Sequence, residues 1–153
     1  MTPLIVENLN KKLASAAGEV HALKNFSASF EAGKRYAVIG PSGCGKSTLL
    51  YLLGLLDKPS SGEITLCGER TSKASEATLE SLRNRHIGFV FQFHYLLPEL
   101  TVLENLLLPA LKAGTEKTVA SERARELLKS IGLSAKEGRK ATEISGGEQQ
   151  RVA

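Results

Sequence analysis

The chain has 153 residues, of which 42% are hydrophobic and 24% charged, a composition typical of a folded domain and not of a disordered chain. Its net charge is +4, but lysine and arginine alternate with glutamate and form no basic stripe, so we expect no nucleic-acid partner. The longest apolar stretch, residues 49–56, is far shorter than the roughly 20 residues of a membrane-spanning helix. With 2 cysteines and no basic, apolar leader, the sequence predicts a protein of a reducing cytosol.

The first half of the chain predicts strands separated by turns and one helix. Residues 4–13 and 19–30 are rich in β-forming side chains and predict two strands joined by the small residues between them. The apolar run 35–40 predicts a buried parallel strand, because strands covered on both faces have continuous apolar sequences. Residues 47–56 have the composition of a helix, and 61–68 predict a further strand.

The second half predicts mainly helices. Residues 75–86 predict a helix, and the apolar run 87–92 predicts a second buried strand. The segment 101–114 begins with a Thr-x-x-Glu capping box, and Pro109 is expected to kink or end its helix. The clearest helix is predicted over 116–132. Its apolar face is expected to contain Val119, Ala120, Ala124, Leu127, Leu128 and Ile131.

The segment GPSGCGKS, residues 40–47, matches the phosphate-binding pattern G-x-x-x-x-G-K-[S/T]. Backbone N–H groups converge on a phosphate only where glycine torsions leave no side chain in the way, and a following helix adds positive potential. In such a loop Lys46 reaches the β- and γ-phosphates and the Ser47 hydroxyl binds Mg²⁺. The predicted nucleotide-binding residues of this loop are Gly40, Pro41, Ser42, Gly43, Cys44, Gly45, Lys46, Ser47 and Thr48.

A phosphate-binding loop is expected to work with an acidic Mg²⁺ partner at the end of another apolar strand. The run 52–57 ends in Asp57, the only aspartate, but it lies on the helix leaving the loop, so its carboxylate is predicted far from the phosphates. Gln92 ends the predicted strand 87–92. Two interpretations of Gln92 stay open: an ordinary polar residue at a strand end, or a ligand of Mg²⁺ or of an attacking water.

The segment ISGGEQQR, residues 144–151, places a Ser-Gly-Gly turn before a helix. Such a turn offers a hydroxyl, unobstructed N–H groups and a helix dipole to an anion, although alone it could be an ordinary N-cap. Together with the phosphate-binding loop and the intervening Gln92, its spacing resembles the ATP-binding-cassette (ABC) ATPases. In that family these segments are Walker A, the Q-loop and the signature motif, from whose common form Ile144 and Glu148 depart.

The resemblance covers nearly the whole chain and implies an α/β fold. It implies a P-loop NTPase core with an N-terminal antiparallel β subdomain and a helical subdomain, as a single incomplete domain over 1–153. The core is expected over about 1–92, the helical subdomain over about 93–145, and the start of the signature helix at 146–153. In this family Walker B and the catalytic glutamate follow the signature helix, so the sequence is expected to be truncated before Walker B and poor at hydrolysis alone.

The resemblance also implies ATP and Mg²⁺ as cofactors and a head-to-tail pair of subunits that encloses two ATP molecules. Walker A of one chain would hold each ATP, and the signature motif of the other chain would touch its γ-phosphate. Ser47 and Gln92 would bind the metal ion. The implied catalytic residues are Lys46, Gln92, Ser145 and Gly147. The implied signature contacts with the nucleotide are Ser145, Gly146, Gly147 and Glu148.

The segments EVHALKN and FVFQFHYLLPELTVLENLLLPALKAG are similar to those of lipoprotein-release and macrolide-export ATPases. That likeness implies a homodimer on the cytoplasmic face of the inner membrane, peripheral to it. An integral membrane permease subunit would dock near Gln92–Leu100. Two alternatives stay open: a non-catalytic nucleotide-binding fragment, and a soluble ABC ATPase without a transport role.

Two positions depart from the family or its usual chemistry. An aromatic side chain usually stacks on adenine from the first strand region, and the matching position here is Leu13, which would hold the base by apolar contact only. Cys44 lies inside the phosphate-binding loop. It is either a tolerated small residue or a reactive thiol activated by the loop N–H groups and Lys46.

Overall fold

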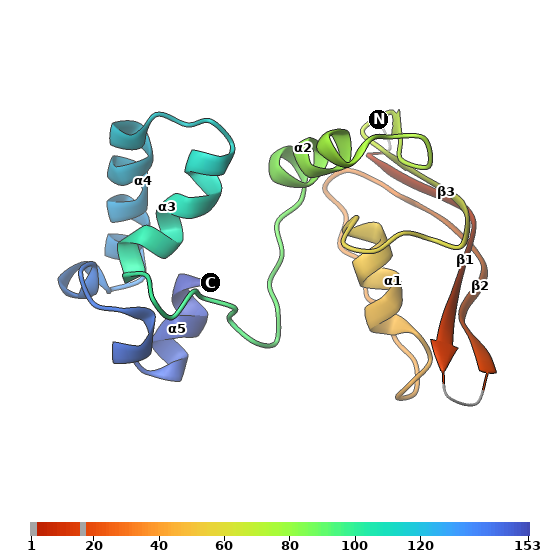
Figure 1. Ribbon diagram of the computed structural model, residues 1–153, viewed down its shortest axis with the longest axis horizontal. Helices are drawn as coiled ribbons and strands as arrows, with labels where there is room; N and C mark the ends of the chain where they lie inside the picture. Colours follow the sequence, from red (N-terminus) through yellow and green to blue (C-terminus); the bar gives the residue numbers. More distant parts are fainter. Residues whose placement is uncertain (1–2, 16–17) are drawn as a thin grey trace. The chain divides into compact units, whose positions relative to one another are not determined.

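The computed structural model describes residues 3–15 and 18–153. The chain divides into two compact units, Met1–Ile87 and Gly88–Ala153, and each unit has its own hydrophobic core (Figure 1). The first unit contains the antiparallel sheet and two helices, whereas the second is helical. Across the residues that the structure describes, no helix combines the length and the apolar character needed to cross a membrane.

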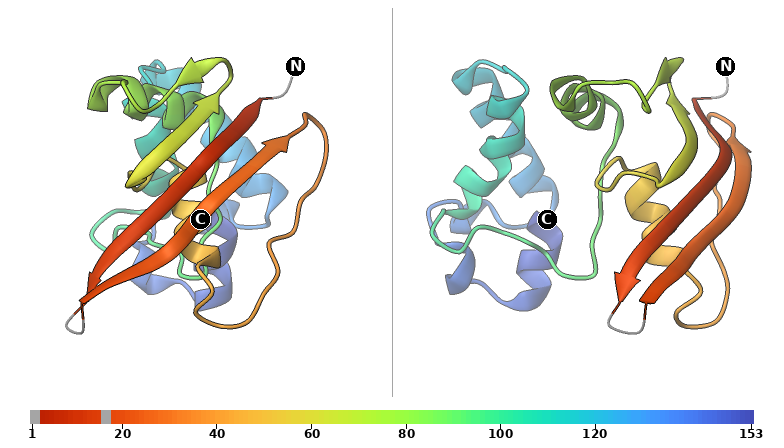
Figure 2. Two further views of the ribbon diagram at one scale, coloured as in Figure 1. Left: turned by 90° about the vertical axis from the view of Figure 1, so that its right-hand side faces the viewer. Right: turned by 45° about the vertical axis from the view of Figure 1, so that its right-hand side comes forward.

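The first unit is built on a four-stranded sheet in the order β2-β1-β3-β4 (Figure 2). β1 (Leu4–Ser15) and β2 (Gly18–Phe30) form a long antiparallel hairpin. β3 (Ser61–Leu66) pairs with β1, and the short β4 (Glu69–Arg70) pairs with β3, again antiparallel. The strands predicted over 4–13, 19–30 and 61–68 are therefore confirmed, while the predicted connection at residues 16–17 lies outside the described residues.

Two helices cover one face of this sheet: α1 (Lys46–Leu53) and α2 (Glu76–His86) (Figure 2). Their apolar side chains meet those on the inner face of β1 and β3, where burial of each large side chain contributes roughly 1.5–3 kcal/mol. Ser75 caps α2 by accepting a hydrogen bond from the backbone N–H of Thr78. The buried core of the first unit comprises Val6, Leu9, Leu49, Leu52, Leu55, Ile64, Leu66, Leu79 and Leu82.

The second unit packs α3 (Val102–Lys112) against α4 (Lys117–Ser130), followed by two short 3₁₀ turns and α5 (Gly146–Val152). The predicted capping box is present: the Thr101 hydroxyl accepts from the Glu104 N–H, and the Glu104 carboxylate accepts from the Thr101 N–H. The core of this unit comprises Val102, Leu107, Ala120, Ala124, Leu128, Leu133, Ile144 and Val152.

Two details of the predicted helices are corrected by the structure. α3 continues past Pro109 to Lys112, so this proline does not end the helix. The apolar face of α4 is narrower than its sequence pattern predicts, because Val119 is 56% exposed and Leu127 is 40% exposed. Only the small residues and Leu128 of that face are buried, since α3 approaches along a narrow stripe.

The two predicted buried parallel strands are wrong for the structure described. Residues 35–40 and 87–92 contain no strand. Residues 35–40 are exposed, with Ile39 at 89%, whereas in the second segment Val90 is 88% exposed and Ile87, Phe89 and Phe91 are half-buried. A strand needs neighbours for its backbone N–H and C=O groups. Within residues 3–15 and 18–153 every ladder of named strands lies in the antiparallel sheet, and none includes these two segments.

A buried carboxylate joins β3 to the segment after β4. Glu63, only 7% exposed, accepts hydrogen bonds from Arg70 Nε at 2.9 Å, Ser72 N at 3.0 Å and Ser72 Oγ at 2.5 Å. Burial alone would raise the pKa of Glu63, but the hydrogen bonds from Ser72 and the Arg70 guanidinium outweigh it and lower that pKa to about 2.

Glu63→Gln is expected to destabilise the chain in a pH-dependent way. A carboxylate whose pKa falls from 4.5 to about 2 on folding stabilises the folded state above pH 4.5 and loses this contribution as the pH falls toward 2. The variant should lose on the order of 2–3 kcal/mol of unfolding free energy at pH 7, and the difference should shrink below pH 4. Urea unfolding of both chains across this range measures it. Glu69→Gln, at an exposed position of β4, is the matched control. An equal loss of unfolding free energy in this control would contradict a specific stabilising role of the Glu63 carboxylate.

Candidate nucleotide-binding site

The phosphate-binding loop of the first unit ends where α1 begins. Gly45 is the N-cap of α1 with φ of +92°, a conformation that residues with a Cβ rarely adopt. No side chain caps this helix end, so its first N–H groups are left for a ligand. Gly43 also has a positive φ, of +79°. The glycines at these positions therefore give the loop the backbone geometry that the sequence pattern predicts.

The Lys46 ammonium is folded back over this loop. Its Nζ donates to the carbonyl oxygens of Gly40 at 2.9 Å and Pro41 at 2.8 Å, and it lies 3.9 Å from Cys44 Sγ. These carbonyls are neutral partners, weaker than a phosphate that would make charge-assisted hydrogen bonds. Ser47 and Cys44 are exposed. The loop thus holds a cation and an exposed hydroxyl next to each other at the start of α1.

The loop rests directly on the β hairpin. A Cβ added to Gly45 would lie 2.3 Å from the carbonyl oxygen of Ala22 in β2, so only glycine permits this approach. Further toward the hairpin turn, Leu13 of β1 pairs with Val20 of β2. Both side chains are exposed, at 41% and 52%, and cross-strand partners share one face of a sheet. They form an apolar platform, and only the Leu13 half of it was predicted from the sequence.

Gln92 lies in the second unit, in a bend, with its side chain exposed. It is flanked by aromatic residues: Phe89 stacks on Phe91 at 5.2 Å, and Tyr95 meets Phe91 edge to face at 5.1 Å between ring centroids. The Gln150 side chain on α5 donates to the Phe91 carbonyl at 3.2 Å. Thus the signature helix is bonded to the residue just before Gln92, a contact that the sequence motifs alone did not predict.

The signature segment forms the N-terminus of α5. Ser145 is the N-cap, with a capping box in which the Glu148 carboxylate accepts from the Ser145 N–H at 2.8 Å. Added Cβ atoms at Gly146 and Gly147 would meet nothing within 4 Å, so this turn is open. Glu148 also pairs with Lys136, and the hydrogen bonds from Lys136 and Ser145 lower its pKa to about 2. The Glu148 carboxylate is therefore engaged by its own unit.

The side-chain oxygen donors of the predicted site can be tested against the ligands that Mg²⁺ prefers. Among the described residues no group of three or more His, Cys, Asp or Glu side chains could hold a metal ion. The Ser47 hydroxyl and the Gln92 side chain are single oxygen donors, one in each unit. Mg²⁺ typically takes one or two protein ligands together with phosphate oxygens and waters, so either donor by itself suits a metal ion that arrives with a nucleotide.

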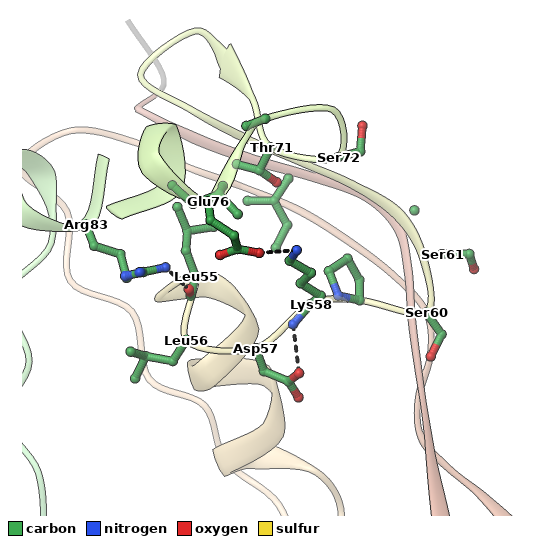
Figure 3. A pocket seen from close by; sticks show the side chains of 15 residues that line it. Leu55, Leu56, Asp57, Lys58, Ser60, Ser61, Thr71, Ser72, Glu76 and Arg83 are labelled. Atoms are coloured by element: carbon green, nitrogen blue, oxygen red, sulfur yellow. Dashed lines mark hydrogen bonds and ion pairs between the residues drawn. The ribbon is translucent and has the colours of Figure 1, made fainter. Parts of the chain in front are cut away.

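A cavity elsewhere in the first unit is unrelated to this loop. A cavity of about 650 Å³ lies between the segment after α1, β3 and α2, with none of residues 40–48 in its lining. Figure 3 shows its rim, where Lys58 pairs with Glu76 and the Arg83 guanidinium donates to the Leu55 carbonyl at 2.7 Å. Because these polar groups bind one another, we do not place the nucleotide there.

An open glycine loop with its lysine, followed along the chain by a glutamine in a bend and a serine-capped Gly-Gly helix start, defines a nucleotide-binding cassette. The chain belongs to the ABC transporter family, whose model matches residues 23–153. It is 51% identical over 150 residues to the lipoprotein-releasing system ATP-binding protein LolD of Aquifex aeolicus, covering 98% of this chain and 65% of that protein. The LolD of Geobacter metallireducens is 47% identical, with 98% and 67% covered. The family resemblance predicted from the sequence is thereby confirmed.

Comparison with solved structures also finds ATP-binding cassettes. A dimeric ATP-binding cassette in a post-hydrolysis state bound to ADP and Pi matches with a TM-score of 0.88 at 36% identity, over 97% of this chain and 66% of that one. The likeness confirms the predicted α/β P-loop fold of the ABC ATPases. The chain spans just under two thirds of the length of the Aquifex LolD that it matches, at 65%.

The Ser145 cap is expected to stabilise the signature helix measurably. Ser145→Ala should raise amide hydrogen exchange in α5 by an amount equivalent to about 1 kcal/mol, because the Glu148 N–H loses its acceptor. Ser145→Gly should cost only a few tenths of a kcal/mol, since glycine is tolerated at N-caps. Hydrogen exchange followed by mass spectrometry on α5 peptides distinguishes the two. Unchanged exchange of α5 in Ser145→Ala would show that the hydroxyl does not cap this helix.

Proposed function

We propose that this chain is the ATP-binding part of a transport-coupled ABC ATPase that drives lipoprotein release or export. The observation that carries the proposal is the position of Lys46, whose ammonium donates to backbone carbonyls of its own glycine loop. This loop leads into the N-terminus of α1, which no side chain caps. A triphosphate would displace the Gly40 and Pro41 carbonyls from the ammonium and accept from the free N–H groups. The curated relatives named LolD support the cargo class.

We propose an individual role for each group of the site. Gly40 to Thr48 would cradle the phosphates, Ser47 and Gln92 would bind Mg²⁺, and the Leu13–Val20 platform would contact adenine. Ser145, Gly146 and Gly147 would face the γ-phosphate of ATP held by a second copy. The open space at both glycines supports this role, because a phosphate could approach their backbone. Glu148 would act there mainly by holding the Ser145 backbone.

A second copy and a membrane permease are the proposed partners, on the cytoplasmic face of the inner membrane. The dimeric cassette matched at 36% identity supports the pairing. The segment Gln92–Leu100 offers exposed aromatic residues to the permease, including Phe93 and Tyr95, each 65% exposed. No nucleic acid is proposed, since the described residues present no aromatic platform within a basic stripe.

Lys46→Ala is expected to lower the affinity for MgATP at least about 100-fold, because the ammonium's charge-assisted hydrogen bonds to the β- and γ-phosphates are lost. Isothermal titration of the folded chain with MgATP measures this. Lys34→Ala, which removes an exposed lysine in the turn before the loop, is the control and should leave affinity unchanged. Unaltered binding in Lys46→Ala would contradict the proposal.

ATP turnover separates the transport ATPase from its two alternatives. We expect turnover by the complete protein to rise when its membrane permease is added in lipid vesicles, because a coupled ATPase is regulated by its partner. Steady-state phosphate release with and without permease is the measurement. Turnover that is unchanged by the permease would indicate a soluble ABC ATPase, and MgATP binding without any turnover would indicate a non-catalytic module.

A further inference from the structure

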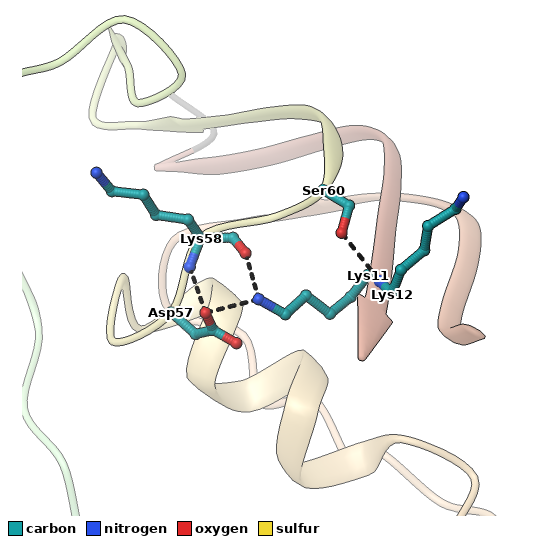
Figure 4. A network of polar contacts seen from close by, with 5 residues as sticks. All are labelled: Lys11, Lys12, Asp57, Lys58 and Ser60. Carbon is teal, nitrogen blue, oxygen red and sulfur yellow. Dashed lines mark hydrogen bonds and ion pairs between the residues drawn. The ribbon is translucent and has the colours of Figure 1, made fainter. Parts of the chain in front are cut away.

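The segment from the phosphate-binding loop through α1 is attached to the hairpin at both of its ends. At the first end, Gly45 lies against the Ala22 carbonyl of β2. At the other end, Lys11 Nζ of β1 donates to Asp57 Oδ1 and to the Lys58 carbonyl, each at 2.7 Å (Figure 4). The two attachments lie at the same level of the hairpin, because Lys11 pairs with the residue that follows Ala22.

The first attachment coincides with a bulge in β2. Lys11 pairs with Leu23 and Lys12 pairs with His21, so Ala22 is the extra residue of the ladder. A bulge bends its strand and re-aims a backbone or side-chain group at a functional site. Here the carbonyl of the extra residue is the atom that Gly45 approaches. The bulge at Ala22 is therefore part of the surface against which the phosphate-binding loop packs.

The second attachment is a partly buried ion pair. The Lys11 side chain is 13% exposed and that of Asp57 is 40% exposed. Side chains alternate along a strand, so Lys11 shares the face of Leu13, while Lys12 points to the other face and pairs with Glu19. Lys11 therefore lies one step from the apolar platform. Its partner Asp57 follows α1, the helix that begins at Lys46.

We propose that the Lys11–Asp57 ion pair is a positioning device that sets the separation between the Leu13–Val20 platform and the phosphate-binding loop. This inference rests on the proposed function, because it assigns adenine to the platform. A nucleotide has its base and its phosphates joined by a short ribose, so both contacts form only when the two sites are correctly spaced. Lys11 is thus a positioning residue that acts through Leu13 and α1, with no contact of its own to the ligand.

Binding of two ligands tests this. Titrate the folded chain with MgATP and with inorganic tripolyphosphate in the presence of Mg²⁺, for wild type, Lys11→Met, Asp57→Asn and the matched control Lys12→Met. We expect Lys11→Met and Asp57→Asn to weaken MgATP about tenfold or more while changing tripolyphosphate less than about twofold. Lys12→Met should change neither ligand, and Lys11→Arg should restore most of the MgATP affinity. Asp57→Asn keeps the side-chain shape and provides the test if Lys11→Met fails to fold.

The outcomes are distinguishable from failure of the proposed function. Equal weakening of both ligands would show that the ion pair merely stabilises the fold, and it would overturn the inference. Unchanged binding of both ligands in Lys11→Met and Asp57→Asn would also overturn it. A wild-type chain that binds neither ligand would instead overturn the proposed function, and with it the inference. Tripolyphosphate binding by wild type without tighter binding of MgATP would exclude the adenine platform and overturn the inference, while leaving phosphate binding at the loop intact.

Discussion

The contact between α1 and the β1–β2 hairpin is the interaction on which the first unit depends. The sheet has one apolar face, and the leucines of α1 cover it together with those of α2. The same contact places the phosphate-binding loop, because Gly45 reaches the Ala22 carbonyl where any Cβ would collide with it. The position of α1 therefore sets both the packing of the core and the geometry of the phosphate-binding loop. A change that shifts α1 to relieve the core also moves the loop.

The need of every strand for hydrogen-bonded neighbours explains where the structure departs from its sequence pattern. Residues 35–40 and 87–92 have the continuous apolar character of buried strands. In the structure described both are irregular, 35–40 is exposed and 87–92 is only partly buried, because no described strand pairs with them. An apolar sequence makes a segment suitable for burial in a sheet, but it becomes a buried strand only where neighbouring strands are present to pair with it.

In the second unit the same groups serve structure and proposed ligand binding. The Ser145 hydroxyl and the Glu148 carboxylate close a capping box, and Lys136, at the end of the earlier 3₁₀ turn Ser134–Lys136, pairs with that carboxylate. This arrangement occupies the side chains but leaves the Gly-Gly backbone open. Gln149 adds hydrogen bonds to the carbonyls of Ala141 and Ile144, so the turn before α5 is held on both sides. A rigid backbone with unobstructed glycines suits an anion better than a flexible one would.

Sequence patterns alone suffice to predict the hairpin, β3, the helices with their Ser75, Thr101 and Ser145 caps, and the motifs of the site. These depend on local patterns: alternation, helical period, glycine torsions and caps read within a few residues. The tertiary structure alone decided that Val20 joins Leu13, that Ala22 seats Gly45, and that Lys11 binds Asp57. Cross-strand register and helix-on-sheet packing bring together residues as far apart along the chain as Leu4 and Leu66, and no local pattern encodes such distances.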